Sequence, residues 1–98
     1  MALSPSKEFE PEIYDLLGYA YFKKGNYKLG MDFFRTAISL NPQSPIPYAN
    51  LGSAYAGIGD QAKAIEYYQQ AGKLGWGDAQ YAIDRVQTKA VQKGDRAK

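Results

Sequence analysis

The chain has 98 residues, a formal net charge of +2 from twelve basic and ten acidic side chains, and neither cysteine nor histidine. This length suits a single domain with a modest core, and the near-balanced charge gives no sign of a nucleic-acid or anionic-membrane partner. The two missing residue types exclude disulfides, thiolate chemistry, cysteine- or histidine-based metal sites, and every catalytic triad with histidine as its base.

Hydropathy adds no membrane or export signal. No apolar run approaches the ~18 residues that a membrane span needs, and residues 1–9 contain no apolar segment typical of a signal peptide. We therefore expect no cofactor, no metal, no nucleic-acid partner, no membrane insertion and no enzymatic activity. The sequence leaves the compartment open; we expect a soluble protein, with the cytoplasm slightly favoured.

Helical periodicity begins a short way into the chain. Residues 1–10 are polar and are predicted to be irregular, whereas apolar residues at helical spacing predict a helical hairpin over residues 11–44. The pattern breaks at Gly25-Asn26, which marks the turn. It ends at Asn41-Pro42, because proline cannot continue a helix.

The same pattern recurs over residues 45–78, displaced by 34 residues. It predicts a second hairpin with its turn at Gly59-Asp60, where Asp60 can accept a backbone N–H as the N-cap of the following helix. The matched pairs are Tyr14 with Tyr48, Leu17 with Leu51, Gly18 with Gly52, Ala20 with Ala54, Tyr21 with Tyr55, Phe34 with Tyr68, and Ala37 with Ala71. So many agreements in small and aromatic residues indicate a true internal repeat.

Two glycines lie in the middle of predicted helices. Gly18 and Gly52 each cost about 1 kcal/mol relative to alanine at such positions. This cost is tolerable if a partner helix passes too close for a β-carbon, so we expect close helix packing at both. Aromatic residues at helical spacing are predicted to fill the gaps between helices: Tyr14, Tyr21, Phe34, Tyr48, Tyr55 and Tyr68.

Residues 79–93 predict one further helix, which carries a single apolar stripe made of Ala79, Ala82, Ile83, Val86 and Ala90. The Leu-Gly pair of the two hairpins is missing, and Arg85 and Lys89 stand at positions that are apolar in those hairpins. A stacked array needs a last helix with a polar outer face, so we interpret this segment as a capping helix. Residues 94–98 are predicted to form a disordered tail.

The pattern resembles the tetratricopeptide repeat, whose unit is a hairpin of about 34 residues. The first hairpin matches with Tyr14, Leu17, Gly18, Tyr21, Phe34, Ala37 and Pro42, and the second with Tyr48, Leu51, Gly52, Tyr55, Ala64, Tyr68 and Ala71. The chain departs from the family at Gly30, where alanine is usual, and at Trp76, where proline is expected. The resemblance covers about residues 11–78 and implies an all-α, right-handed α-solenoid of two hairpins with a C-terminal capping helix.

The resemblance also implies a function, because first helices of successive hairpins in this family line a concave groove that holds peptides. Carried over by position, the groove residues are Glu12, Asp15, Tyr19, Phe22, Lys23, Asn50, Ser53 and Ile83, with Ile46, Ala49, Ala56, Gln80 and Gln87 beside them. We therefore expect a non-catalytic adaptor or scaffold that binds a peptide or protein. Tyr19 and Phe22 lie off the packing positions and are the candidate aromatic anchors.

The family's chaperone-binding members clamp a C-terminal carboxylate with Lys, Asn, Asn, Lys and Arg at set positions. Only Asn50 matches, and the other four positions hold Asp15, Tyr19, Gln80 and Asp84. Because acidic residues repel a carboxylate, the sequence predicts no such clamp. With Glu12 also near the groove, an apolar or basic partner segment is expected rather than an acidic C-terminal tail.

A second function stays open, which is self-assembly. Two hairpins and a cap lie near the lower limit for an independent repeat array, so an exposed end could be covered by another copy. An exposed Trp76 and the outer face of the first helix are the candidate contacts, and a homo-oligomer is a possible outcome. The sequence does not identify the partner or the pathway.

Overall fold

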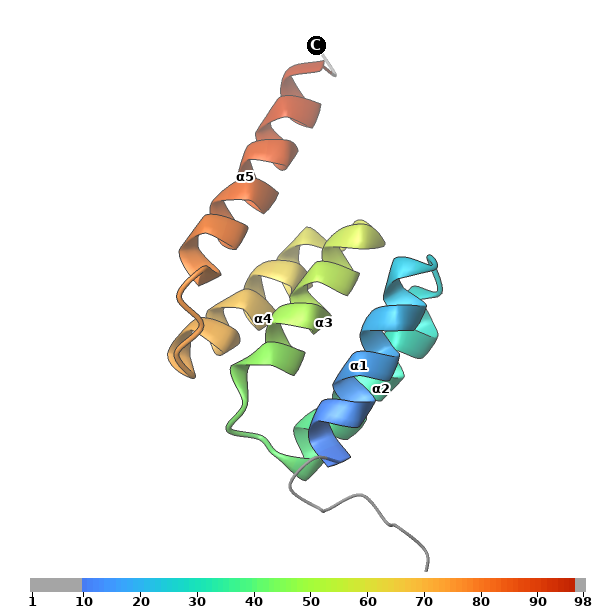
Figure 1. Ribbon diagram of the computed structural model, residues 1–98. Helices are drawn as coiled ribbons and strands as arrows, with labels where there is room; N and C mark the ends of the chain where they lie inside the picture. Colours follow the sequence, from blue (N-terminus) through green and yellow to red (C-terminus); the bar gives the residue numbers. More distant parts are fainter. Residues whose placement is uncertain (1–9, 97–98) are drawn as a thin grey trace, which may run out of the picture.

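The computed structural model describes residues 10–96, and this range contains five α-helices and no strand (Figure 1). The predicted all-α class is confirmed. The helices are α1 (Glu10–Lys23), α2 (Tyr27–Leu40), α3 (Pro45–Gly57), α4 (Gln61–Lys73) and α5 (Ala79–Arg96).

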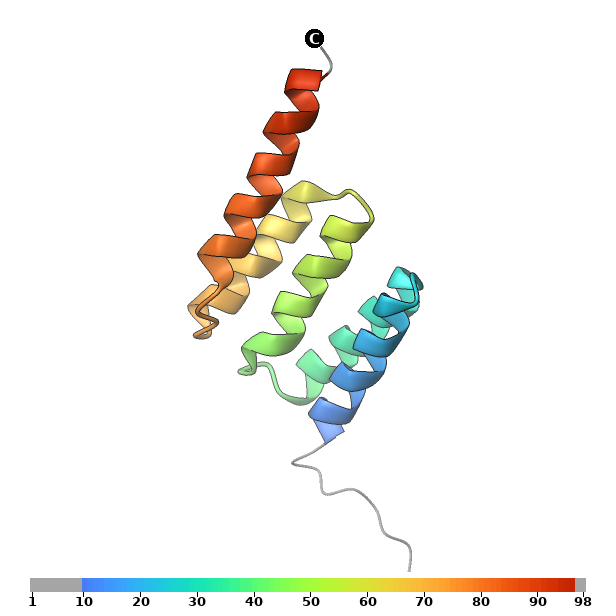
Figure 2. The same ribbon diagram turned by 45° about the horizontal axis from the view of Figure 1, so that its top comes forward.

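The helices form two hairpins that stand side by side and one final helix. The α1–α2 hairpin packs against α3 mainly through α2, and α5 packs mainly on α4. Figures 1 and 2 show α1 and α2 at one end of the row and α5 at the other, where α5 continues past the end of α4. Each helix therefore packs chiefly on its neighbours in sequence.

Both hairpin turns use the same local chemistry. Gly25 and Gly59 each adopt φ of 90°, a left-handed conformation that glycine reaches without strain. The next residue then caps the second helix, because the side chain of Asn26 accepts from the Leu29 amide and that of Asp60 from the Lys63 amide. The predicted role of Asp60 is confirmed.

The two mid-helix glycines lie where helices approach most closely, as predicted. A β-carbon on Gly18 would lie 2.7 Å from the Phe34 ring and 2.8 Å from the carbonyl oxygen of Gly30. One on Gly52 would lie 2.6 Å from the Tyr68 ring. A β-carbon on Gly30 would in turn meet the Gly18 carbonyl at 2.8 Å, which explains why this position departs from alanine.

The core runs through both hairpins and into α5. Phe34 and Leu51 are its largest fully buried side chains. The other buried members of the cluster are Met31, Ala54, Tyr55, Ala64, Tyr68, Ile83 and Val86. Tyr55 also links the hairpins, because its hydroxyl accepts a 2.7 Å hydrogen bond from Arg35 on α2 while its ring stacks on Tyr67 of α4.

Three sequence expectations need correction or limits. The last helix runs to Arg96 and not to residue 93, and Glu10 already belongs to α1. The predicted irregular segment otherwise lies outside the described residues, as do residues 97–98 of the predicted tail. Trp76 is not an exposed contact: it is partly buried against the core and stacks on Tyr68 with ring centroids 5.6 Å apart.

Candidate binding groove

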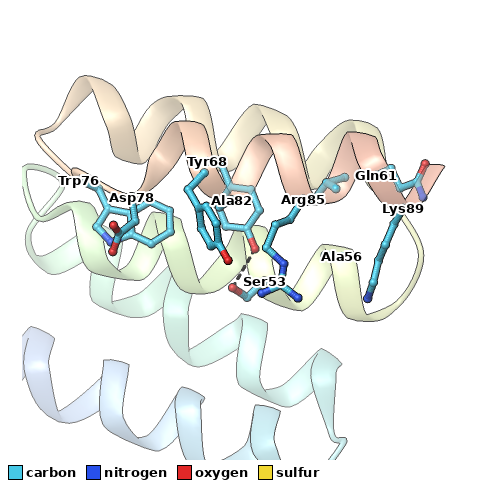
Figure 3. Close-up of a pocket in the computed structure, with 11 residues that line it drawn as sticks. Ser53, Ala56, Gln61, Tyr68, Trp76, Asp78, Ala82, Arg85 and Lys89 are labelled. Atoms are coloured by element: carbon cyan, nitrogen blue, oxygen red, sulfur yellow. Dashed lines mark hydrogen bonds between the residues drawn. The ribbon is translucent and has the colours of Figure 1, made fainter. Parts of the chain in front are cut away.

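A hollow of about 490 Å³ lies between α3 and α5 (Figure 3). This hollow is called the groove. Its walls come from α3 and α5, and Tyr68 and Trp76 contribute aromatic surface. The lining residues are Ser53, Ala56, Gln61, Tyr68, Trp76, Asp78, Tyr81, Ala82, Arg85, Val86 and Lys89.

A fixed pair of hydroxyls lies in the middle of this groove. The Ser53 side chain on α3 and the Tyr68 hydroxyl on α4 are 2.9 Å apart and share a hydrogen bond (Figure 3). Trp76 stacks on the same tyrosine ring. The groove therefore offers rigid aromatic surface beside a polar point, which is the composition typical of a recognition site.

The α5 wall carries most of the charge in this half of the groove. Arg85 lies over the Tyr81 ring at 5.9 Å, and Figure 3 shows its guanidinium directed toward Ser53. Lys89 lies near Gln61 at one end, and Asp78 lies beside Trp76 at the other (Figure 3). Tyr81 is 65% exposed and is thus an aromatic side chain available to a partner.

On the other side of α3, a hydrogen bond joins this helix to α1. The Asn50 amide on α3 donates to the Asp15 carboxylate on α1 at 2.8 Å. Burial raises the pKa of the Asp15 carboxyl above its ordinary 3.8, and the hydrogen bond from Asn50 offsets part of this rise. Two predicted groove residues are thus joined, and they fix the spacing between the first helices of the two hairpins.

The predicted aromatic anchors on α1 lie together but differ in exposure. Tyr19 and Phe22 stack with ring centroids 6.2 Å apart, and the Lys23 ammonium lies 5.7 Å from the Tyr19 ring centre. Tyr19 is 47% exposed, whereas Phe22 is partly buried and contacts the Tyr27 ring edge-on. Glu12 is exposed on the same helix. Tyr19 is therefore available to a ligand, and Phe22 mainly supports it.

Ile83 does not lie on the groove surface. The structure places it in the core, 6% exposed, so its predicted place among the groove residues is corrected. The reason is a change of register in α5. Its buried stripe of Ala79, Ile83 and Val86 repeats the buried stripe of Pro47, Leu51 and Ala54 in α3, each 32 residues further on rather than 34.

A shift of two residues moves every side chain around the helix. Each residue turns an α-helix by about 100°, so two residues turn it by about 200° and exchange its inner and outer faces. The predicted Gln80 consequently points away from the groove and donates to Asp84. Tyr81, Arg85 and Lys89 lie in the groove instead. The buried stripes of α3 and α5 share an i, i+4, i+7 spacing. Aligning the two stripes was the sequence signal that could have identified Tyr81, Arg85 and Lys89 as groove residues.

Comparison with known proteins identifies the fold. Residues 18–59 match the family described as TPR repeat, and residues 47–74 match the one described as Tetratricopeptide repeat. Together the two matches span more than half of the chain. The chain belongs to the tetratricopeptide repeat family.

Two individual proteins are similar to this chain, one in sequence and one in fold. The chain is 29% identical over 58 residues to the uncharacterised protein ycf37 of Pyropia yezoensis, and that stretch spans 33% of the relative's length. Its fold is similar to that of the second TPR of Spaghetti (RPAP3) bound to the HSP90 peptide SRMEEVD. The TM-score is 0.77 at 20% identity, over 85% of this chain and 79% of the other.

The corrected register changes the TPR clamp positions without creating a clamp. Counted from the α5 stripe, the last two positions are Asp78, directly before α5, and Ala82 within it, rather than Gln80 and Asp84. With Asp15, Tyr19 and Asn50 at the other three, none of the five is basic.

Across the described residues, no helix is long and apolar enough to cross a membrane.

Proposed function

We propose that this chain is a non-catalytic protein-interaction module that holds a segment of a partner protein along the groove of α1, α3 and α5. The observation that carries the proposal is the aromatic groove between α3 and α5, with Tyr81 exposed at its rim and the Ser53–Tyr68 hydroxyl pair at its centre. A rigid aromatic surface with few fixed polar groups binds apolar side chains and orients them.

The charges favour an apolar or basic segment over an acidic C-terminal tail. Asp15 and Asp78 occupy two of the clamp positions, and Glu12 adds a third carboxylate on α1. A terminal carboxylate would meet negative charge there with no cation at any of the five positions. Arg85 and Lys89 lie outside those positions, where they can pair with a single acidic side chain within the segment.

A peptide array tests this choice of partner. We expect peptides with apolar and basic residues to bind, and we expect acidic C-terminal peptides, SRMEEVD among them, not to bind. Tyr81→Ala and Arg85→Ala remove the exposed aromatic ring of the groove and the guanidinium that lies over it, so each should weaken the array-selected peptides at least about tenfold while helicity is kept.

The matched control is Lys28→Ala, because Lys28 is exposed on α2 and does not line the groove. Trp76 is the only tryptophan of the chain and lines the groove, so its fluorescence reports occupancy directly. Preferential binding of acidic C-terminal peptides would overturn the proposed chemistry. Equal binding by the groove variants and wild type would overturn the site.

A further inference from the structure

One face of α1 carries apolar side chains at helical spacing, but among the described residues no helix packs against it. It comprises Ile13, Leu16, Leu17 and Ala20 and is called the α1 outer face below. Ile13 is 38% exposed, Leu16 69% and Leu17 40%. So large an apolar surface on one helix marks an interaction site rather than ordinary surface variation.

The internal repeat shows what this face is suited to contact. Ile13, Leu17 and Ala20 correspond to Pro47, Leu51 and Ala54 of α3, which are buried, with Leu51 and Ala54 at 0% exposure. In α3, Gly52 faces α4. The buried stripe lies roughly 140° around the helix from Gly52, on the side of α2. The same stripe in α1 therefore has the geometry to receive a helix.

The opposite end of the stack is polar over residues 79–89, the part of α5 whose side chains are described. The side of α5 away from the core carries exposed Gln80, Asp84 and Gln87, and Gln80 donates to Asp84 at 3.0 Å. A polar end of this kind is how a helical array terminates in water. It is a poor surface for the apolar α1 outer face of another copy, which argues against head-to-tail assembly and leaves the α1 outer face to pair with itself.

Charge placement selects the direction of that pairing. Helix α1 begins with Glu10 and Glu12 and ends with Lys23, followed directly by Lys24. An antiparallel arrangement brings the acidic start of one helix beside the basic end of the other, whereas a parallel arrangement brings like charges together. Glu10 and Lys24 lie seven residues on either side of Leu17, so a two-fold axis near Leu17 would pair them.

We propose that two copies of this chain associate through their α1 outer faces, antiparallel and related by a two-fold axis. The hollow between α3 and α5 contains no residue of the α1 outer face, so partner binding there and self-association can be measured separately. One helix of 14 residues is about 21 Å long, and its interface falls below the ~1,600 Å² of a standard stable complex. We therefore expect a dimer that dissociates in the micromolar range or above.

Analytical ultracentrifugation of the full chain tests the dimer. From low micromolar to near-millimolar concentration, the average mass should rise from monomer toward dimer and not beyond. Leu16→Lys should raise the dissociation constant at least about tenfold while helicity is kept, because Leu16 is largely exposed in the single chain. Ile58→Lys is the matched control, since Ile58 is also an exposed apolar residue but caps the end of α3 and is not part of the α1 outer face, and it should behave as wild type.

A charge exchange tests the antiparallel direction. Glu10→Lys should weaken the dimer, and the double variant Glu10→Lys/Lys24→Glu should restore it, because the exchanged charges again face their opposites. A chain that stays monomeric throughout overturns the proposal, even if the face then proves to bind a different protein. Dimerisation that Leu16→Lys leaves unchanged also overturns it, and failure of the double variant to recover overturns the antiparallel arrangement.

Discussion

Single residues determine how closely the helices of each hairpin approach. Gly18→Ala should destabilise the fold by about 1–3 kcal/mol, because the new β-carbon overlaps the Phe34 ring and the Gly30 backbone. The free energy lost to this overlap exceeds the gain from the higher helix propensity of alanine. Urea denaturation followed by circular dichroism measures this loss. Gly77→Ala is the control, since nothing lies within 4 Å of a β-carbon there. Equal stability of the two variants would contradict the packing argument.

Asp15 is the residue at which pH should act. Burial raises its pKa in the folded chain, so between the unfolded value of 3.8 and the folded value the folded state holds more protons. Stability then falls as pH rises through that window. Asp15→Asn should be more thermostable than wild type at pH 7, and its advantage should shrink as pH falls toward 4. Melting curves at several pH values test this.

The control for that experiment is Glu12→Gln, which removes one negative charge from an exposed position on the same helix. Its effect on melting temperature corrects for the change in net charge. A wild-type chain that is more stable than Asp15→Asn at pH 7 would show that the hydrogen bond from Asn50 outweighs the cost of burying the carboxylate.

At the scale of elements, the hairpins are joined by a polar contact as well as by the core. Arg35 on α2 donates to the Tyr55 hydroxyl on α3 at 2.7 Å. Tyr55→Phe keeps the ring, and with it the stacking on Tyr67, so it removes only the hydrogen bond. We expect a cost of about 1 kcal/mol and a similar coupling energy in a double-mutant cycle with Arg35→Ala. Additive effects of the two changes would exclude this link.

Local patterns predicted the elements well. The turns at Gly25 and Gly59, the cap at Asp60 and the close approach at Gly18 all follow from residue chemistry within one hairpin, and the structure confirms them. These features depend on neighbouring residues alone. Helical periodicity therefore located the hairpins and the final helix, although it placed the end of that helix three residues too early.

The rotation of α5 about its own axis, which decides which side chains face the core, could not be predicted in the same way. Periodicity fixes which residues share a stripe, but the phase between successive helices depends on the connecting loop. Here Gly75 adopts φ of 107° and Trp76 stacks on Tyr68 in the loop before α5. The helix begins 34 residues after α3 begins, but its buried stripe lies two residues early in the repeat register. This shift put Ile83 in the core and brought Arg85 into the groove.

At the scale of the whole molecule, the stack presents two distinct surfaces. The aromatic hollow of Tyr68 and Trp76 lies between α3 and α5, and the Asp15–Asn50 hydrogen bond joins α1 to α3. The α1 outer face lies on another side of the same first helix. None of the residues that line the hollow belongs to the α1 outer face, although Glu12 and Lys23 serve both the predicted groove and the proposed charge pairing.

The most direct test of the central claim is a two-dimensional amide NMR titration with a peptide selected on the array. We predict that the largest shift changes fall on groove residues, namely Asn50, Ser53, Tyr81 and Arg85, and that they saturate together with the change in Trp76 fluorescence. Shift changes concentrated on the outer surfaces of α2 and α4, around Thr36 and Gln70, would contradict binding in the groove.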